Sequence, residues 1–163
     1  MNSRLGVYKL LKEFWSKDQC NDFLKLLPKQ DIIVPYTDKD SEIGVWYKNH
    51  ITDQRCTLSV DSNILEHIKT YLPKEYDYTS DRMYVTKYES GQKCIPHIDP
   101  TDITVIILLN DEFEGGELFV RNRKVNLNKG DAIFFSDREI HSVYEITKGT
   151  RYALSVWLKQ QQR

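Results

Sequence analysis

The stretch Pro96-His97-Ile98-Asp99 and the apolar run Thr104-Val105-Ile106-Ile107-Leu108-Leu109 that follows it predict a β-rich core. His97 and Asp99 are two residues apart, so on an extended strand both side chains point to the same face. His141 follows 42 residues after Asp99, near the start of another β-like run. Two imidazoles and one carboxylate, with no fourth ligand evident, fit a non-haem Fe(II) centre that keeps three coordination positions open.

Other interpretations of these three residues stay open at this point. A His-X-Asp sequence alone is weak evidence, because both histidines can be structural and Asp99 can be a turn carboxylate. Zinc binds the same ligand types, so the residues leave the identity of the metal open. The occurrence of all three residues in one β-rich half of the chain favours a metal site.

The second half of the chain alternates short β-like runs with turn residues. The predicted strands are Met83–Tyr88, Lys93–Ile98, Thr104–Leu109, Glu117–Val120, Lys124–Leu127, Ala132–Ser136, Ser142–Ile146 and Arg151–Leu158. A turn at Lys148-Gly149 is expected to join the last two strands as a hairpin. Eight short strands at this spacing predict a mainly β (α+β) fold, a double-stranded β-helix or jelly roll.

The first half of the chain predicts an opening strand within residues 5–15, followed by two helices. Ser16-Lys17-Asp18-Gln19 is a capping-box pattern for a helix that runs to about Leu27. A second helix is expected over Ser62–Leu72, and both helices are expected to pack outside one sheet. Residues 36–55 lack a clear period, and we expect a strand-and-loop region there; the sequence leaves open whether this region is a mobile lid over the substrate.

Length and charge limit the classes of protein that fit. The 163 residues predict a single domain, with residues 1–82 as an N-terminal support and residues 83–159 as the jelly-roll core. The formal net charge of −1 gives no field for nucleic acid or an anionic membrane. Three widely spaced cysteines make no disulfide framework, and no apolar run spans a bilayer, so we expect a soluble, cytoplasmic protein.

Two further residues, Arg151 and Tyr88, have the chemistry of a binding pocket. In period-2 alternation Arg151 shares one strand face with the small residues Ala153 and Ser155, and a guanidinium binds a carboxylate in a bidentate manner. Tyr88 precedes His97 by nine residues and can donate a hydrogen bond from its phenol. Arg151 can also be a surface residue on an edge strand, and Tyr88 a core residue.

The remaining histidines and the nearest cysteine are weaker candidates. His67 is predicted on the polar face of the second helix, where it is solvated. His50 falls within residues 36–55. Cys94 lies three residues before His97, and this odd offset places it on the opposite face of a regular strand. No His/Asn relay accompanies Cys94, so we do not expect a nucleophile.

Taken in order, these residues resemble the Fe(II)/2-oxoglutarate-dependent dioxygenases, and specifically their prolyl 4-hydroxylase-like branch. The resemblance runs from about Met83 to Lys159, nearly half of the chain. The stretches that carry it are Tyr88-Glu89-Ser90-Gly91-Gln92-Lys93, His97-Ile98-Asp99, Thr104-Val105-Ile106-Ile107-Leu108-Leu109-Asn110-Asp111, Gly115-Gly116-Glu117-Leu118, Gly130-Asp131-Ala132, His141 and Lys148-Gly149-Thr150-Arg151.

The resemblance implies an iron centre and a dicarboxylate cosubstrate. His97, Asp99 and His141 are implied as the Fe(II) ligands, and Arg151 as the partner of the distal carboxylate of 2-oxoglutarate. Dioxygen is the second cosubstrate, and ascorbate is an additional family expectation. The implied reaction hydroxylates a substrate C–H bond while 2-oxoglutarate is decarboxylated to succinate and CO₂.

The resemblance also assigns residues around the cosubstrate and the substrate. Tyr88 is implied near the cosubstrate, Thr104 in the pocket lining, and Trp157 near the substrate. In collagen-type enzymes a longer loop with a basic residue for peptide binding stands between the positions of Asp99 and Thr104. That loop is short here, and Lys159 replaces a family histidine.

Three functions are compared on these grounds. The first is a hydroxylase of a prolyl residue in a peptide or protein. The second is a hydroxylase of a free amino acid or another small molecule, and a nucleic-acid demethylase is disfavoured because the chain is neutral and lacks a second Arg-rich motif after His141. The third is a non-catalytic jelly-roll binding module, which has no need of three metal ligands with open positions.

Overall fold

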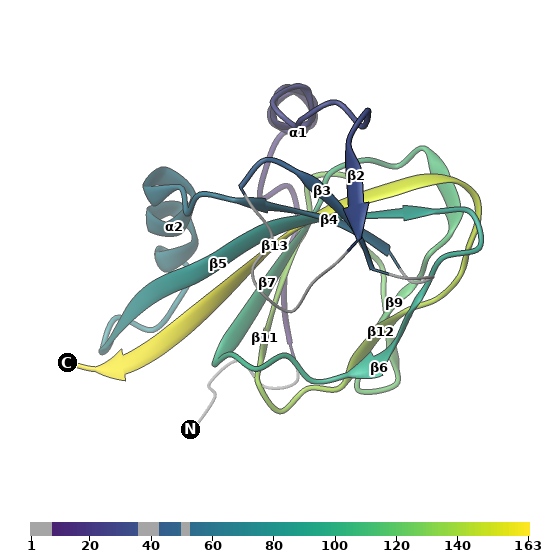
Figure 1. Ribbon diagram of the computed structural model, residues 1–163. Coiled ribbons are helices and arrows are strands. Elements are labelled where there is room, and N and C mark those ends of the chain that lie inside the picture. Colours follow the sequence, from purple (N-terminus) through teal and green to yellow (C-terminus); the bar gives the residue numbers. More distant parts are fainter. Residues whose placement is uncertain (1–7, 36–42, 50–52) are drawn as a thin grey trace.

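The computed structural model describes residues 8–35, 43–49 and 53–163, and within them the chain forms two β-sheets (Figure 1). The larger sheet has the order β1-β11-β7-β13-β5-β4-β3-β2, with β8 paired to β13. Its strands are β1 (Lys9–Leu11), β2 (Ile33–Pro35), β3 (Trp46–Asn49), β4 (Asp53–Leu58), β5 (Tyr76–Glu89), β7 (Ile103–Leu108), β8 (Phe113–Gly115), β11 (Ala132–Ser136) and β13 (Ile146–Gln162).

The smaller sheet has the order β10-β9-β12-β6 and lies against one face of the larger sheet. Its strands are β6 (Cys94–His97), β9 (Leu118–Val120), β10 (Arg123–Val125) and β12 (His141–Val143). An apolar core fills the space between the sheets, with Ile133 and Phe135 from the larger sheet and Leu118 and Val120 from the smaller one. The mainly β, double-stranded β-helix fold is therefore confirmed.

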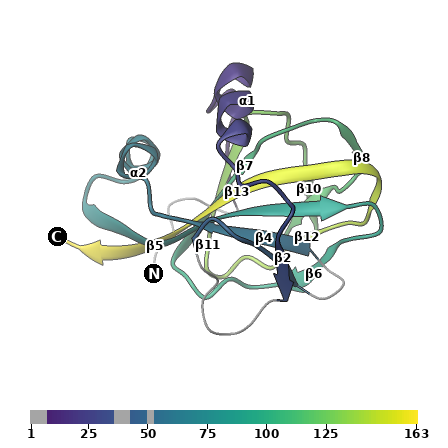
Figure 2. The same ribbon diagram turned by 45° about the horizontal axis from the view of Figure 1, so that its top comes forward.

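Two helices, α1 (Lys17–Lys25) and α2 (Ser62–Lys69), cover the other face of the larger sheet (Figure 2). A second apolar core lies beneath them and includes Ile68 of α2 and Cys20 of α1, both fully buried. Packing of both helices on one sheet confirms the expected arrangement. The site must consequently lie on the opposite side, between the sheets.

The helix ends follow from local capping chemistry. Ser16 and Gln19 form the complete capping box, in which the Ser16 hydroxyl accepts from the Gln19 N–H and the Gln19 side chain accepts from the Ser16 N–H. The second helix begins after Asp61, whose carboxylate accepts from two backbone N–H groups of the first turn. It ends at Lys69, three residues before the predicted end.

The predicted hairpin at Lys148-Gly149 is wrong. These two residues lie inside the continuous strand β13, and β12 pairs with β9 and β6 instead. The register of β13 against β8 shifts between Ile146 and Lys148, which marks a bulge. Gly149 has a φ of 78°, so its glycine character serves a bulge in a long strand and not a turn.

Two regions of the first half differ in extent from the prediction, the opening strand and residues 36–55. Of the predicted opening strand over residues 5–15, only Lys9–Leu11 is a strand, and residues 5–7 lie outside the described residues. Within 36–55, residues 36–42 and 50–52 lie outside the described residues, as does His50. Among the described residues of this region, Trp46–Asn49 forms β3 and residues 53–55 begin β4. Trp46 is almost fully buried.

Candidate metal centre

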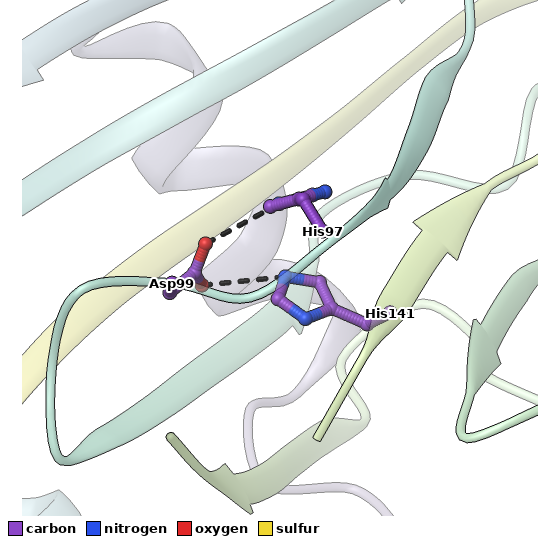
Figure 3. A group of neighbouring side chains, drawn as sticks. All are labelled: His97, Asp99 and His141. Atoms are coloured by element: carbon purple, nitrogen blue, oxygen red, sulfur yellow. Dashed lines mark ion pairs between the residues drawn. The ribbon is translucent and has the colours of Figure 1, made fainter. Parts of the chain in front are cut away.

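Two strands of the smaller sheet bring the two histidines together. His97 ends β6, His141 begins β12, and the two residues are direct partners in the antiparallel register. Asp99 follows β6 by two residues and turns back toward both rings (Figure 3). Strand pairing therefore brings together two histidines that are 44 positions apart in the sequence.

The three side chains are close enough to share one metal ion. Nε2 of His97 lies 3.3 Å from Oδ1 of Asp99, and Nε2 of His141 lies 3.3 Å from Oδ2 of the same carboxylate. Candidate ligand atoms from the three residues all lie within 4.8 Å of one another. Asp99 and His141 are buried, while the His97 side chain is 35% exposed. The arrangement leaves one side of the cluster open to the pocket.

Hydrogen bonds to the backbone orient both imidazole rings. Nδ1 of His97 lies 2.8 Å from the Ile95 carbonyl oxygen, and Nδ1 of His141 lies 3.1 Å from the Glu139 carbonyl oxygen. A carbonyl only accepts, so each Nδ1 carries a hydrogen, and each Nε2 is the ring nitrogen that faces the cluster and would bind a metal. Two imidazole nitrogens and a carboxylate oxygen are the donor set that a non-haem Fe(II) site uses, so these residues fit the metal that the sequence suggests.

When no metal is bound, a proton lies between the His97 ring and the Asp99 carboxylate. The hydrogen bond to Asp99, followed by that to Cys94, raises the pKa of His97 to about 10, against the effect of burial. Burial alone would raise the pKa of the Asp99 carboxyl, but hydrogen bonds from His141 and His97 hold it below its usual range. A bound metal must displace this proton.

Cys94 contradicts the expectation that it lies on the face opposite His97. Its Sγ lies 3.4 Å from Nδ1 of His97, and both side chains line the same pocket. The cause is a register shift in the pairing of β6 with β12, where His141 opposes His97 but Val143 opposes Cys94. The step of three residues on β6, from Cys94 to His97, therefore spans the same length as a step of two residues on β12. This bulge places Cys94 and His97 on the same face of β6.

Arg151 lies on β13 in the same pocket as the three candidate ligands, with Ala153 and Ser155 on the same face. It is only 2% exposed, and burial lowers the pKa of its guanidinium below the ordinary value. No described carboxylate lies within ion-pair distance of it, and its Cζ lies over the Tyr88 ring, 5.7 Å from the centroid. A buried guanidinium without an acidic partner indicates a site for an anionic ligand.

Of the other predicted residues, Tyr88 lines this pocket, and Thr104 and Trp157 lie next to residues that line it. Tyr88 is buried opposite Arg151 in the register, and burial raises the pKa of its phenol, which therefore stays protonated and able to donate. Thr104 donates its hydroxyl to Oδ2 of Asp99 at 2.8 Å. Trp157 pairs with Thr104 on the neighbouring strand, and its buried Nε1 has no hydrogen-bond partner within the described chain.

Sequence reasoning missed Arg55, which lines the same pocket from β4. Its Nε donates to Oδ2 of Asp53 at 2.9 Å, and the Asp53 carboxylate is almost fully buried. The alternation along β4 was the available signal, because Arg55 faces the pocket while its neighbour Cys56 packs in the core beneath the helices. The signal is weak because a strand face that points into a protein is normally recognised by apolar residues at every second position, and here those positions are polar.

The fold and the cluster define a double-stranded β-helix with a His-X-Asp…His centre, the arrangement expected of a non-haem iron oxygenase. A model of the 2OG-Fe(II) oxygenase superfamily matches residues 83–159. Over these residues the chain is similar to this superfamily, and its relatives and structural neighbours support a likeness to the prolyl 4-hydroxylase-like branch. Thus the family resemblance read from the sequence is confirmed.

Curated relatives of the chain are PKHD-type hydroxylases. The one from Hyphomonas neptunium is 35% identical over 80 residues, which are 41% of this chain and 35% of the relative. The one from Delftia acidovorans is 29% identical over 127 residues, 72% of this chain and 56% of the relative. The chain therefore spans about a third to just over half of the length of these relatives.

Solved structures share the fold over nearly the whole chain. The viral collagen prolyl hydroxylase from Paramecium bursaria Chlorella virus-1 superposes with a TM-score of 0.71 at 16% identity, covering 96% of this chain and 97% of that one. A Pseudomonas putida prolyl-4-hydroxylase gives a TM-score of 0.58 at 15% identity, covering 96% and 92%. At these identities the likeness establishes the fold. Across the described ranges, no helix has the length and apolar character needed to cross a membrane.

Proposed function

We propose that this chain is an Fe(II)- and 2-oxoglutarate-dependent dioxygenase that hydroxylates a C–H bond. The observation that carries the proposal is one pocket that contains the cluster of His97, Asp99 and His141 together with the buried guanidinium of Arg151, which has no carboxylate partner among the described residues. A structural metal site needs no such guanidinium, and a simple anion site needs no such cluster. Both features together match what a chelating dicarboxylate cosubstrate requires.

In this proposal each side chain has a defined role. The Nε2 atoms of His97 and His141 and one carboxylate oxygen of Asp99 hold the metal, and Arg151 binds the distal carboxylate of 2-oxoglutarate through a bidentate pair. When bound, Fe(II) supplies the activation of dioxygen that couples decarboxylation of 2-oxoglutarate to succinate and CO₂ with hydroxylation of the substrate. Ascorbate as a reductant remains a family expectation.

The surrounding residues position these groups and limit access of water. We assign the Tyr88 phenol as a donor to the cosubstrate, since it lies opposite Arg151 and stays protonated. Thr104 orients the Asp99 carboxylate through its 2.8 Å hydrogen bond. We assign Trp157 to the substrate side, because it lies beside Thr104 and packs on Tyr84, which lines the pocket.

For the substrate we propose a prolyl residue in a peptide or protein. The support comes from relatives: one solved neighbour is a collagen prolyl hydroxylase, and another, from Trichoplax adhaerens, is a prolyl hydroxylase in complex with a peptide fragment. Oxidation of a small molecule is the second candidate. It is favoured by the short connection from Asp99 to Thr104 and by a neighbour that is an α-ketoglutarate-dependent epimerase from nogalamycin biosynthesis, with a TM-score of 0.65.

The test is an anaerobic titration with Fe(II) and 2-oxoglutarate that monitors the weak visible charge-transfer band of the chelate. We expect the band in the unaltered chain, its loss in His141→Ala, and a far higher 2-oxoglutarate requirement in Arg151→Ala. Two matched controls, His67→Ala and Arg123→Ala, remove an exposed histidine and an exposed arginine outside the pocket and should keep the band.

The outcomes separate the three candidate functions. Absence of the band in folded, iron-loaded protein would contradict the dioxygenase proposal and favour a structural metal site or a binding module. With the band present, peptides that contain proline are screened for succinate release. Succinate release with small molecules but with none of the peptides would favour the second candidate.

A further inference from the structure

Four side chains from three neighbouring strands contact one another beside the pocket: Arg55 of β4, Arg82 and Tyr84 of β5, and Trp157 of β13. We call them the arginine–aromatic rim. β4, β5 and β13 lie side by side in the larger sheet (Figure 1), and Arg82 and Trp157 are direct register partners. Arg55 and Tyr84 also line the pocket of the candidate metal ligands, so the rim is continuous with the proposed catalytic site.

Stacking holds both guanidinium groups at the rim. Cζ of Arg82 lies 4.7 Å from the Trp157 ring centroid and 5.1 Å from that of Tyr84, and Cζ of Arg55 lies 5.2 Å from the Tyr84 centroid. Tyr84 and Trp157 pack edge to face at 5.8 Å. A guanidinium stacked on an aromatic face keeps its N–H edge free to donate, so the rim presents oriented donors.

The charge of the rim is only partly neutralised. Asp53 pairs with Arg55, but no carboxylate of the described chain lies within ion-pair distance of Arg82. Lys159, two residues beyond Trp157, donates to the carbonyl oxygen of Pro100 at 3.3 Å, which is a neutral acceptor. Arg82 and Lys159 therefore carry positive charge beside the pocket that the carboxylates of the described residues leave unmatched.

The inner part of the pocket needs no further anion under the proposed function. The charges of Fe(II) and Arg151 would be matched by Asp99 and the two carboxylates of 2-oxoglutarate. Arg55 is matched by Asp53. The unmatched charge of Arg82 and Lys159 is thus available to the substrate.

We propose that the substrate is an acidic peptide, in which a carboxylate beside the residue to be oxidised pairs with Arg82 at the arginine–aromatic rim. This proposal rests on the proposed function and specifies its substrate class. Arg55 then donates from its terminal nitrogens to a neutral acceptor such as a peptide carbonyl, since its charge is already paired. Lys159 adds to the attraction at long range.

The test measures binding by calorimetry in the chain loaded with Fe(II) and 2-oxoglutarate under argon, so that no turnover occurs. The probes are the blocked peptides Ala-Glu-Pro-Glu-Ala and Ala-Gln-Pro-Gln-Ala, which differ only in charge. We expect the Glu peptide to bind about fivefold more tightly, as for a partly exposed ion pair, with a preference that falls as salt is added. In Arg82→Gln the two peptides should bind equally.

Two further variants keep the result interpretable. Arg82→Lys preserves the charge and should keep the preference for the Glu peptide even if stacking is weakened. Arg123→Gln removes an exposed arginine from β10 and should change neither affinity. The visible band of the Fe(II)–2-oxoglutarate chelate reports in each sample that the metal site is intact.

Equal affinity of the unaltered chain for the two peptides would overturn the proposal, as would no measurable binding of the Glu peptide. A preference for the Glu peptide that persists in Arg82→Gln would also contradict it. Because the visible band is recorded in the same samples, these failures differ from failure of the proposed function, in which the band itself is missing.

Discussion

At the scale of single residues, the candidate metal centre depends on neighbours that do not touch the metal. The backbone carbonyls of Ile95 and Glu139 orient the two imidazoles, and the Thr104 hydroxyl orients the Asp99 carboxylate. Such supporting hydrogen bonds typically change metal affinity by about 10- to 100-fold. Thr104 is the one among these contacts that a substitution removes directly.

We predict that Thr104→Val lowers the affinity for Fe(II) by about tenfold, because Asp99 loses a hydrogen bond that fixes its orientation. Thr101→Val is the matched control, since the buried Thr101 hydroxyl donates to the Leu158 carbonyl oxygen at 2.9 Å and not to a candidate ligand. Metal titration of both variants checks the prediction. Equal loss of affinity in the two variants would show a general effect on the fold.

The proton shared by His97 and Asp99 predicts how pH acts on the metal site. The pKa of His97 is raised from 6.5 to about 10, so below pH 10 a metal must displace a proton and its apparent affinity increases with pH. In the metal-free chain, the same pair adds stability that is complete below pH 6.5 and is lost as the pH rises through about 10.

We therefore predict that Co(II), used as an air-stable probe, raises the melting temperature more at pH 8 than at pH 6. Binding at pH 8 should release about one proton per metal, which calorimetry in buffers of different ionisation enthalpy measures. Binding without proton release would show that the cluster is already deprotonated in the metal-free chain.

At the scale of elements, bulges set which side chains face the pocket. The bulge between β6 and β12 places Cys94 beside His97, and the bulge near Gly149 lets β13 pass β8 without turning. A Cβ at Gly149 would lie 2.3 Å from the Glu112 carbonyl oxygen and 3.0 Å from the Phe113 Cα. Both atoms belong to the backbone and have little freedom to move aside.

We predict that Gly149→Ala destabilises the chain by roughly 3 kcal/mol or more, which combines a positive-φ penalty of about 1 kcal/mol with the steric clash. Gly91→Ala is the matched control. Gly91 has a similar φ of 87° but open space where its Cβ would lie, so only the backbone penalty applies. Urea unfolding compares the two variants, and equal losses would argue against the clash.

At the scale of the whole molecule, Asp131 ties the N-terminal segment to the β-sheet core. Its carboxylate accepts from Lys12 Nζ at 2.9 Å, from the Glu13 N–H at 2.9 Å and from the Asn128 N–H at 2.8 Å. Burial would raise the pKa of Asp131, but these hydrogen bonds outweigh it and lower the pKa. One carboxylate therefore joins segments more than 100 residues apart in the sequence.

We predict that Asp131→Asn lowers the unfolding free energy by roughly 1–3 kcal/mol at neutral pH, since a buried charged acceptor is lost. Because the folded-state pKa is depressed, this stability is present above about pH 3.8 and is lost as the pH falls through the folded-state value. The difference between variant and unaltered chain should shrink at pH 3. Asp22→Asn, an exposed helix residue, should change little at either pH.

We also propose that the chain folds as one domain, with residues 1–82 supporting the core at 83–159. Two pairings favour this proposal: β1 pairs with β11, and β4 pairs with β5 within the larger sheet. A single unfolding transition, coincident by circular dichroism and tryptophan fluorescence, is expected. Two separated transitions would contradict a single cooperative unit.

The sequence by itself determined the features that depend on near neighbours. Ser16 and Gln19 predict the start of α1, because a capping box forms within four residues. The alternation of Arg151, Ala153 and Ser155 predicts their shared face, and the turn residues predict the mainly β class. The metal and cosubstrate roles assigned to His97, Asp99, His141 and Arg151 remain predictions that the titrations test.

Only the tertiary structure decided which distant segments meet. Strand pairing placed His141 beside His97, a bulge reversed the face of Cys94, and the sheet order brought Arg55 into the pocket. The continuity of β13 through Gly149 likewise depends on β8 beside it. The physical reason is that register and bulges are fixed by hydrogen bonds and packing between strands far apart in the chain, and a local sequence pattern does not contain that partner.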